Sequence, residues 1–237
     1  MDDGSPLRVY SQRVTDNLRS INHDVDFEFA MRYGNPSIRS GLESLKQRGV
    51  TDLLLLPMFP HYAQATTESS LKHAHLQLKA MNWSPNLLEM GHFETAEEFI
   101  GPLTESIRPH LSEDTHLLFS YHGLPVSHVK RIDRSKAHCQ TVEACCTVKC
   151  EANSLCYGRH CNETTMAVVE RLGLKPDQWS LSYQSRLGPV KWLEPSTTQM
   201  VEALVKKGVK KLAIVAPAFL ADGLETLEEL DIGIREE

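Results

Sequence analysis

The sequence lacks any apolar run near the roughly 20 residues that a membrane-spanning helix needs, and it lacks an excess of positive charge. Lys and Arg total 25 against 31 Asp and Glu, which gives a net charge of −6, so a nucleic-acid partner is not expected. The start, Met1-Asp2-Asp3-Gly4, is acidic and has no apolar core, which argues against a signal peptide. These absences favour a cytoplasmic protein and leave a peripheral membrane contact and the oligomeric state open.

Cysteine is absent from most of the chain, because all six residues of this type lie within one short segment. In a reducing compartment such residues are ligands or free thiols more often than disulfides. Four thiolates suit an iron–sulfur cluster or a structural zinc ion, and free thiols are the third alternative. Spacing does not identify which four would bind. The six are Cys139, Cys145, Cys146, Cys150, Cys156 and Cys161.

A linker rich in Pro, Gly or Ser is also missing, and strand-like runs instead alternate with helical patterns along the 237 residues. This alternation predicts an α/β fold with parallel sheets. Asn35-Pro36 is expected to start a helix, and Ser196 to Gln199 has the spacing of a capping box. The predicted strands cover Val25 to Met31, Leu53 to Leu56, Leu87 to Phe93, Leu117 to Tyr121, Trp179 to Tyr183 and Leu212 to Ala216.

Two parts of the chain resemble each other. Gly49 through Phe59 and Gly208 through Phe219 each give a helix stop, a strand, a proline and an aromatic residue. We interpret this as two similar α/β halves that face each other across a cleft. The boundary is predicted near Phe93, giving a first half over 1–93 and a second half over 94–237, with a cysteine-rich insertion at about 126–161.

Two polar stretches follow predicted strands. His122 ends one apolar run, and Gly123 and Pro125 stop the strand there. Ligands bind at the carboxyl edge of open α/β sheets, although a core histidine is an equally good interpretation of this stretch alone. The second stretch carries Glu225 and Glu229, which share one helix face at i, i+4 spacing. A solvated acidic helix start explains that spacing as well.

Taken together, several motifs resemble the ferrochelatase family over nearly the whole chain outside the cysteine segment. Their number and order make the resemblance specific. They are Gly4-Ser5-Pro6-Leu7, Met31-Arg32-Tyr33, Pro60-His61-Tyr62 with Thr66-Thr67, Ser120 to Pro125, Ser182 to Arg186, Gly188-Pro189 with Trp192-Leu193, and Asp222 with Leu224 to Asp231.

The resemblance, closest to bacterial members, implies two Rossmann-like, chelatase-type halves around a central cleft. It also implies an enzyme that inserts ferrous iron into protoporphyrin IX to form heme, with His122 and Glu225 as the catalytic and metal-site pair. Asp222, Glu229 and Asp231 match an acidic path for the metal. Residues matching the porphyrin cleft are Arg32, Tyr33, Tyr121, Gln184, Arg186 and Trp192.

The chain also departs from the family pattern. We expect it to be truncated at both ends, with an incomplete first half, and Gly223 stands where many relatives carry another residue. The cysteine segment is similar in position to an insertion that carries a [2Fe-2S] cluster in some bacterial members, so we expect such a cluster outside the cleft. A zinc ion is the second choice there.

Two other functions stay open from the sequence. One is a chelatase for cobalt or for another tetrapyrrole. The other is a non-catalytic iron–sulfur or metal sensor, which would need the cysteines but not His122 or Glu225.

Overall fold

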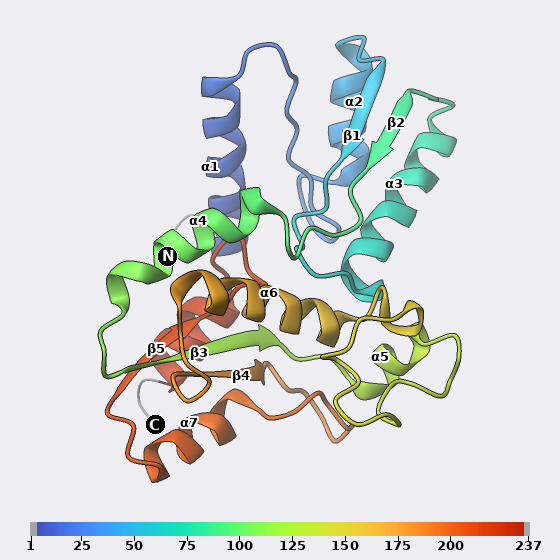
Figure 1. Ribbon diagram of the computed structural model, residues 1–237. Coiled ribbons are helices and arrows are strands. Elements are labelled where there is room, and N and C mark those ends of the chain that lie inside the picture. Colours follow the sequence, from blue (N-terminus) through green and yellow to red (C-terminus); the bar gives the residue numbers. More distant parts are fainter. Residues whose placement is uncertain (1–3, 235–237) are drawn as a thin grey trace.

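The computed structural model describes residues 4–234 (Figure 1), so the acidic Met1-Asp2-Asp3 start lies outside the described part. Two parallel sheets with flanking helices confirm the α/β class. One sheet pairs β1 (Asp52–Leu55) with β2 (Asn86–Glu89). The other has the order β4-β3-β5, from β3 (Thr115–His122), β4 (Trp179–Gln184) and β5 (Lys211–Val215).

The α-helices alternate with these strands, and short 3-10 and π-helices complete the chain. The α-helices are α1 (Pro6–Ile21), α2 (Ile38–Gln47), α3 (Ser69–Ala80), α4 (Glu97–Ile107), α5 (Val126–Ile132), α6 (Tyr157–Leu172) and α7 (Thr197–Lys206). The 3-10 helices are η2 (Arg108–His110) and η3 (Glu151–Asn153), and the π-helices are η1 (Gln64–Glu68) and η4 (Glu225–Ile234).

The second sheet forms the main core. Its central strand, β3, pairs with β4 on one side and β5 on the other, and Leu117 to Phe119 are at most 1% exposed. Figure 1 shows α4 and α6 over one face of this sheet and α7 over the other. Coverage on both faces explains why β3 is buried at every position from Thr115 to Tyr121 and carries the unbroken apolar run Leu117 to Phe119 instead of alternating.

The first sheet is smaller and less covered. Leu53 of β1 is buried with Leu42, Leu45 and Leu78 in a cluster of its own. Leu54 and Leu56, however, are 54% and 44% exposed, so this apolar strand is not covered on both faces in the way that an apolar run in a parallel sheet would predict.

The predicted strand over Val25 to Met31 is also wrong. This segment is extended, but only Met31 makes a β-bridge, to Ser37. Alternating side chains make a strand only where a neighbouring strand supplies hydrogen bonds. The N-cap of the helix expected to start at Asn35-Pro36 is Ser37 instead, and its side chain accepts a hydrogen bond from Ser40 N. The capping box at Ser196 and Gln199 is confirmed.

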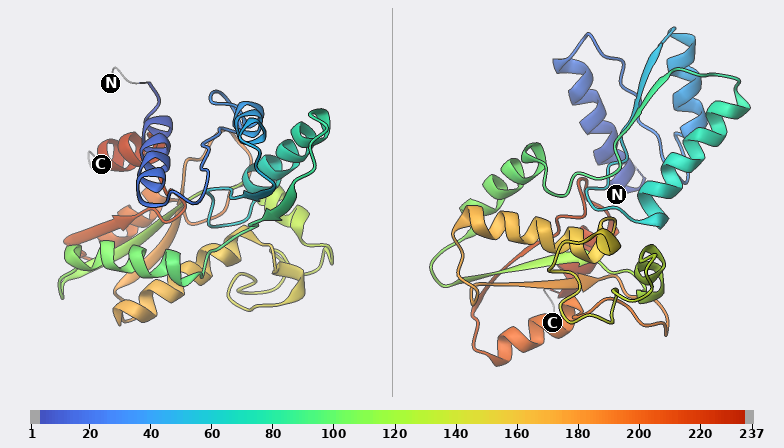
Figure 2. Two further views of the ribbon diagram at one scale, coloured as in Figure 1. Left: turned by 90° about the horizontal axis from the view of Figure 1, so that it is seen from above. Right: turned by 45° about the vertical axis from the view of Figure 1, so that its right-hand side comes forward.

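One loop of the first half is embedded in the core of the second. His61 is 2% exposed and packs edge-on against the rings of Phe99, Tyr121 and Tyr157. The right-hand view of Figure 2 shows the first sheet and its helices standing apart from the larger sheet. The division near Phe93 stays a prediction, supported by the two separate hydrophobic clusters.

No helix among residues 4–234 combines the length and the apolar character that crossing a membrane requires.

Hydrogen exchange should separate the two segments that the sequence predicts as strands. Leu117 to Phe119 are buried and paired on both sides, whereas the N–H groups of Phe27 to Ala30 donate no hydrogen bond within the described residues. We expect the Leu117–Phe119 amides to exchange at least about 100-fold more slowly, because opening β3 requires breaking the core. The measurement is amide exchange by NMR or mass spectrometry, and equally strong protection of both segments would contradict the structure.

Candidate functional site

His122 is the last residue of β3, and the backbone turns away directly after it. Gly123 N donates to Gln184 O of β4 at 2.8 Å, and a Cβ atom at Gly123 would lie 2.8 Å from that same oxygen. Only glycine therefore allows the turn to approach the neighbouring strand. Tyr157, at the start of α6, fixes the carbonyl of His122 through a hydrogen bond of 2.8 Å.

Two carboxylates come near His122 from η4, which follows β5. Glu225 and Glu229 both lie near enough to His122 for their charges to act on its imidazole. The helix that carries the acids is a π-helix over ten residues, a form that the i, i+4 spacing does not distinguish from an α-helix. π-helical segments are rare and are found frequently at functional sites.

Burial decides the charge of the histidine. It lowers the pKa of His122 below the ordinary value of 6.5, and the charges of Glu225 and Glu229 oppose this only in part. The imidazole is therefore neutral at pH 7 and can accept a proton or donate a lone pair to a metal ion. The Glu225 carboxylate accepts no hydrogen bond within residues 4–234, so it is free to do either as well.

Two residues that match the porphyrin cleft of the family are buried below the surface in this structure. Tyr121 is 0% exposed, and its hydroxyl pairs with Thr165 Oγ1 at 2.8 Å in the core. Gln184 is 2% exposed and donates from Nε2 to Glu225 O at 2.7 Å. The reason is that β3 and β4 are covered on both faces up to their carboxyl ends, so neither side chain presents a surface to a macrocycle.

The remaining predicted residues around this edge lie nearer the solvent. Trp192 packs over Gly123, with Cε3 3.4 Å from the position of a Cβ atom there, and its buried Nε1 has no hydrogen-bond partner among the described residues. Arg186 donates to Leu193 O at 3.2 Å. Asp222 is exposed and accepts from Thr226 Oγ1, and Asp231 is exposed on η4.

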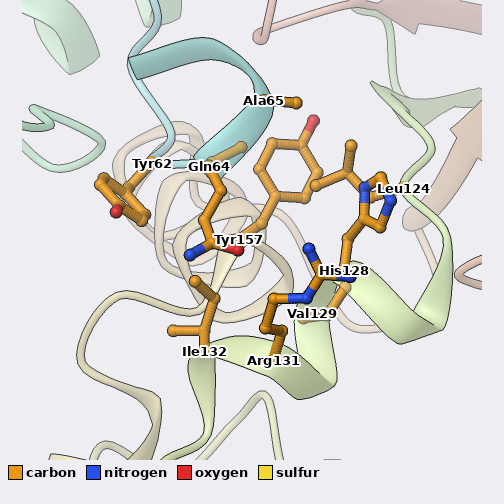
Figure 3. A pocket seen from close by; sticks show the side chains of 10 residues that line it. Tyr62, Gln64, Ala65, Leu124, His128, Val129, Arg131, Ile132 and Tyr157 are labelled. Carbon is orange, nitrogen blue, oxygen red and sulfur yellow. The ribbon is translucent and has the colours of Figure 1, made fainter. Parts of the chain in front are cut away.

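Two adjoining cavities lie between η1, α3 and α5. The first, of about 210 Å³, has Tyr62 and Gln64 on one side and side chains of α5 on the other, with Tyr157 and Leu124 completing the wall (Figure 3). The second, of about 430 Å³, shares Gln64 and Arg131 with the first.

Arg32 lines the second cavity, together with Lys72 and His73. Its Nε donates to Ser69 Oγ at 2.8 Å, and its guanidinium lies 4.5 Å from the centre of the Tyr33 ring. Tyr33 is 72% exposed and does not line either cavity. The second cavity is thus lined by the cationic side chains of Arg32, Lys72 and Arg131 and by the carboxylate of Glu68, which pairs with Lys72.

Four of the cysteines gather on one side of the start of α6. The Sγ atoms of Cys145 and Cys146 are 3.8 Å apart, and Cys146 hydrogen-bonds to Cys156. Cys139 is near enough to Cys156 and Cys145 for their charges to act on it. Cys150 lies apart from this group, with its Sγ 3.7 Å from His138 Nε2.

The thiols differ in their readiness to ionise. A hydrogen bond from Cys146 and the backbone N–H groups of Arg159 and Gly158 lower the pKa of Cys156, which is the N-cap of α6. Complete burial raises the pKa of Cys161 well above its ordinary value. Cys156 therefore has the character of a metal ligand, and Cys161 that of a core thiol.

Between α5 and α6 the cysteine segment holds one turn of helix, η3, and two polar side chains order it. Asp133 accepts hydrogen bonds from the backbone N–H groups of His138 and Cys139, and Asn153 donates to Cys145 O. Cys156 directly precedes Tyr157 of the first cavity's wall, but none of the six cysteines lines either cavity, and the position of the segment outside the cleft stays a prediction.

Sequence reasoning missed a buried polar group at the junction of the halves. His92, Glu94 and His160 place their ring nitrogens and carboxylate oxygens within 4.8 Å of one another. Tyr62 N donates to His160 Nδ1, so His160 Nε2 carries the proton that bonds Ser154 O. His160 then has no lone pair left for a metal ion, and the group serves to join the Tyr62 loop to α6. No spacing in the sequence reveals it.

Comparison with known proteins gives one consistent result. A family model described as Ferrochelatase matches residues 1–237. A ferrochelatase of Bdellovibrio bacteriovorus is 39% identical, aligned over 100% of this chain and 70% of that protein. Ferrochelatases of Pseudomonas syringae pv. syringae and Pseudomonas aeruginosa are each 38% identical, covering 97% and 100% of this chain and 68% and 70% of their own length.

Replacing Glu225 by Gln should lower the pKa of His122 further. The Glu225 anion stabilises the imidazolium and so raises this pKa, and its removal leaves burial less opposed. The measurement is an NMR titration of the imidazole nitrogens in both proteins. His116, at the amino end of the same strand, is the internal control and should titrate unchanged. An unchanged or higher pKa of His122 would show that the two side chains do not face each other.

Proposed function

Because the chain belongs to the ferrochelatase family, we propose that His122 and Glu225 carry out on this chain the reaction of that family, the insertion of ferrous iron into a porphyrin for heme synthesis. The observation that supports this most directly is the neutral imidazole beside an unpaired carboxylate at the carboxyl edge of the second sheet. The family match favours an enzyme over a sensor.

The reaction replaces two N–H bonds of the porphyrin with bonds to iron, and the iron stays ferrous. Two protons must leave, and the neutral ring of His122 accepts one of them. Glu225 attracts the incoming cation and then takes or passes a proton. Glu229, together with the more exposed Asp222 and Asp231, forms the proposed acidic path for the hydrated ion. Imidazole and carboxylate ligands hold ferrous iron weakly enough to release it to the tetrapyrrole.

The two cavities are the proposed part of the porphyrin cleft on this chain. The first offers the apolar wall of Leu124, Val129 and Ile132 to a macrocycle. The second offers Arg32 and Arg131 as partners for porphyrin carboxylates, because guanidinium and carboxylate pair in two-point fashion. Trp192 and Arg186 flank the edge where His122 lies.

We propose a [2Fe-2S] cluster in the cysteine segment. Cys139, Cys146 and Cys156 supply three ligands, and Cys145, the nearest remaining thiol, is the fourth, with Cys150 as its alternative. The donor set fits, because four thiolates bind such a cluster and Cys156 ionises readily. Cys161 is excluded from the set by its complete burial among tyrosine side chains. Zinc is the second choice for the same ligands.

We also propose a cytoplasmic location. The exposed apolar residues Leu7, Val14 and Leu18 on α1 favour a peripheral membrane contact.

His122→Ala should reduce porphyrin metallation at least about 100-fold, because the proton acceptor is lost. Glu225→Gln should also reduce porphyrin metallation. The assay is anaerobic conversion of porphyrin to heme, followed by absorbance, with circular dichroism to check folding. His110→Ala, at an exposed position, is the matched control and should keep full activity. Near-normal turnover of the His122 variant would reject the proposed role.

Anaerobically purified protein should be brown and hold about two irons and two sulfides per chain. Cys156→Ser and Cys146→Ser should each lose the absorption of the cluster, whereas Cys161→Ser should keep it. Comparing Cys145→Ser with Cys150→Ser identifies the fourth ligand. Stoichiometric zinc without iron or sulfide would overturn the cluster.

A further inference from the structure

The Glu229 carboxylate is held by three donors at the carboxyl end of β4. Ser185 N donates to Oε1 at 2.6 Å, and the Ser185 hydroxyl donates to Oε2. Gln184 Nε2 lies 3.4 Å from the same Oε2. Glu225, one turn earlier on η4, has no such donors on its carboxylate within the described residues. The Glu229 carboxylate is therefore held by hydrogen bonds, whereas the Glu225 carboxylate accepts none from the described residues.

The backbone of Ser185 is arranged for this contact at a conformational cost. Its φ is +61°, in the left-handed region that residues other than glycine rarely adopt. In this conformation the N–H and the hydroxyl of one residue reach both oxygens of one carboxylate. Strained backbone of this kind persists only where its surroundings fix it, and it occurs preferentially at functional sites.

The surroundings that fix it are the core of the second half. Gln184 Oε1 accepts from Ser120 Oγ of β3 at 2.7 Å, and Ser120 Oγ pairs with Thr197 Oγ1, at the start of α7, at 2.8 Å. All three side chains are at most 2% exposed. The other end of the Gln184 amide donates to Glu225 O. A buried hydrogen-bond chain thus connects the sheet to Glu225 and Glu229 of η4.

We infer that Ser185 is a positioning residue for iron delivery, and that it acts by holding the Glu229 carboxylate. This inference rests on the proposed function. With Glu229 held by Ser185 directly after β4, the first turns of η4 are held in place, and the Glu225 carboxylate stays near enough for its charge to act on the His122 imidazole. Ser185 itself does not contact the metal or the porphyrin. Its hydroxyl therefore matters only while Glu229 carries a carboxylate that accepts from it.

A double-mutant cycle between Ser185→Gly and Glu229→Gln tests this dependence. Glycine removes the hydroxyl, keeps the backbone N–H and tolerates a φ of +61°, so folding is not put at risk. We expect S185G to raise the KM for ferrous iron about tenfold, the size expected for losing a hydrogen bond to a charged group. Turnover at saturating iron and the KM for porphyrin should stay within about twofold.

In the E229Q background the same S185G change should alter the iron KM by less than about twofold, because the charged acceptor is already absent. Ser180→Ala, near the other end of β4, is the matched control and should leave all constants unchanged. A rise in the porphyrin KM would show that Ser185 contacts the substrate and would overturn the inference. Equal effects of S185G in both backgrounds would overturn it too.

Manganese binding keeps the test independent of turnover. Mn²⁺, a redox-stable divalent ion, is titrated with the same four proteins and followed by electron paramagnetic resonance. S185G should weaken Mn²⁺ binding severalfold with Glu229 present and leave it unchanged in E229Q. If the unaltered chain does not metallate porphyrin, the proposed function fails, and the manganese cycle still decides whether Ser185 acts through Glu229. Equal manganese affinities of the unaltered protein and S185G would refute that action.

Discussion

The candidate site depends on a close approach of two backbones at the end of β3. Gly123 lies so near to Gln184 O that no side chain fits, and this contact sets the register in which His122 lies beside Gln184. From Gln184 the amide reaches the first carbonyl of η4, and Ser185 reaches Glu229. One hydrogen-bonded edge of the sheet thereby fixes the histidine and both glutamates, although more than 100 residues separate them in the sequence.

The likeness of the two halves extends further than the sequence shows. In each half a strand is followed by a proline, an aromatic residue and a π-helix, η1 after β1 and η4 after β5. One carbonyl oxygen before each π-helix accepts two backbone hydrogen bonds. Ala63 O accepts from the N–H groups of Thr66 and Glu68, and Gly223 O accepts from those of Thr226 and Leu227. The two turns carry different chemistry. The first lines the cavities with Gln64, and the second brings carboxylates to His122.

How much the sequence predicts depends on whether a residue's partners are local. The end of β3 at His122 and the capping box at Ser196 follow from neighbouring residues, and both are confirmed. The strand expected over Val25 to Met31 fails, because alternation does not supply a neighbouring strand. Tyr121 and Gln184 lie in the core for a related reason, since a strand covered on both faces gives no alternation from which to predict exposure.

The π-helix shows another limit of prediction. Glutamates four residues apart share a face in an α-helix, and they remain neighbours when the turn widens, so the spacing cannot tell the two helices apart. The wider turn is fixed instead by contacts with β4, which are distant in sequence. The family resemblance identifies these glutamates without geometry, but it gives no sign that one is held and the other free.

The cysteine segment is connected directly to the candidate site through the first turn of α6. Cys156 caps α6, and the next residue, Tyr157, bonds the carbonyl of His122 and lines the first cavity. Gly158 then lies so close to Cys146 that a Cβ atom would be 3.0 Å from its Sγ. Three consecutive residues thus connect the thiols with the sheet edge that carries His122. Because interiors are close-packed, the conformation of the cysteine segment and the placement of His122 are physically linked through the first turn of α6.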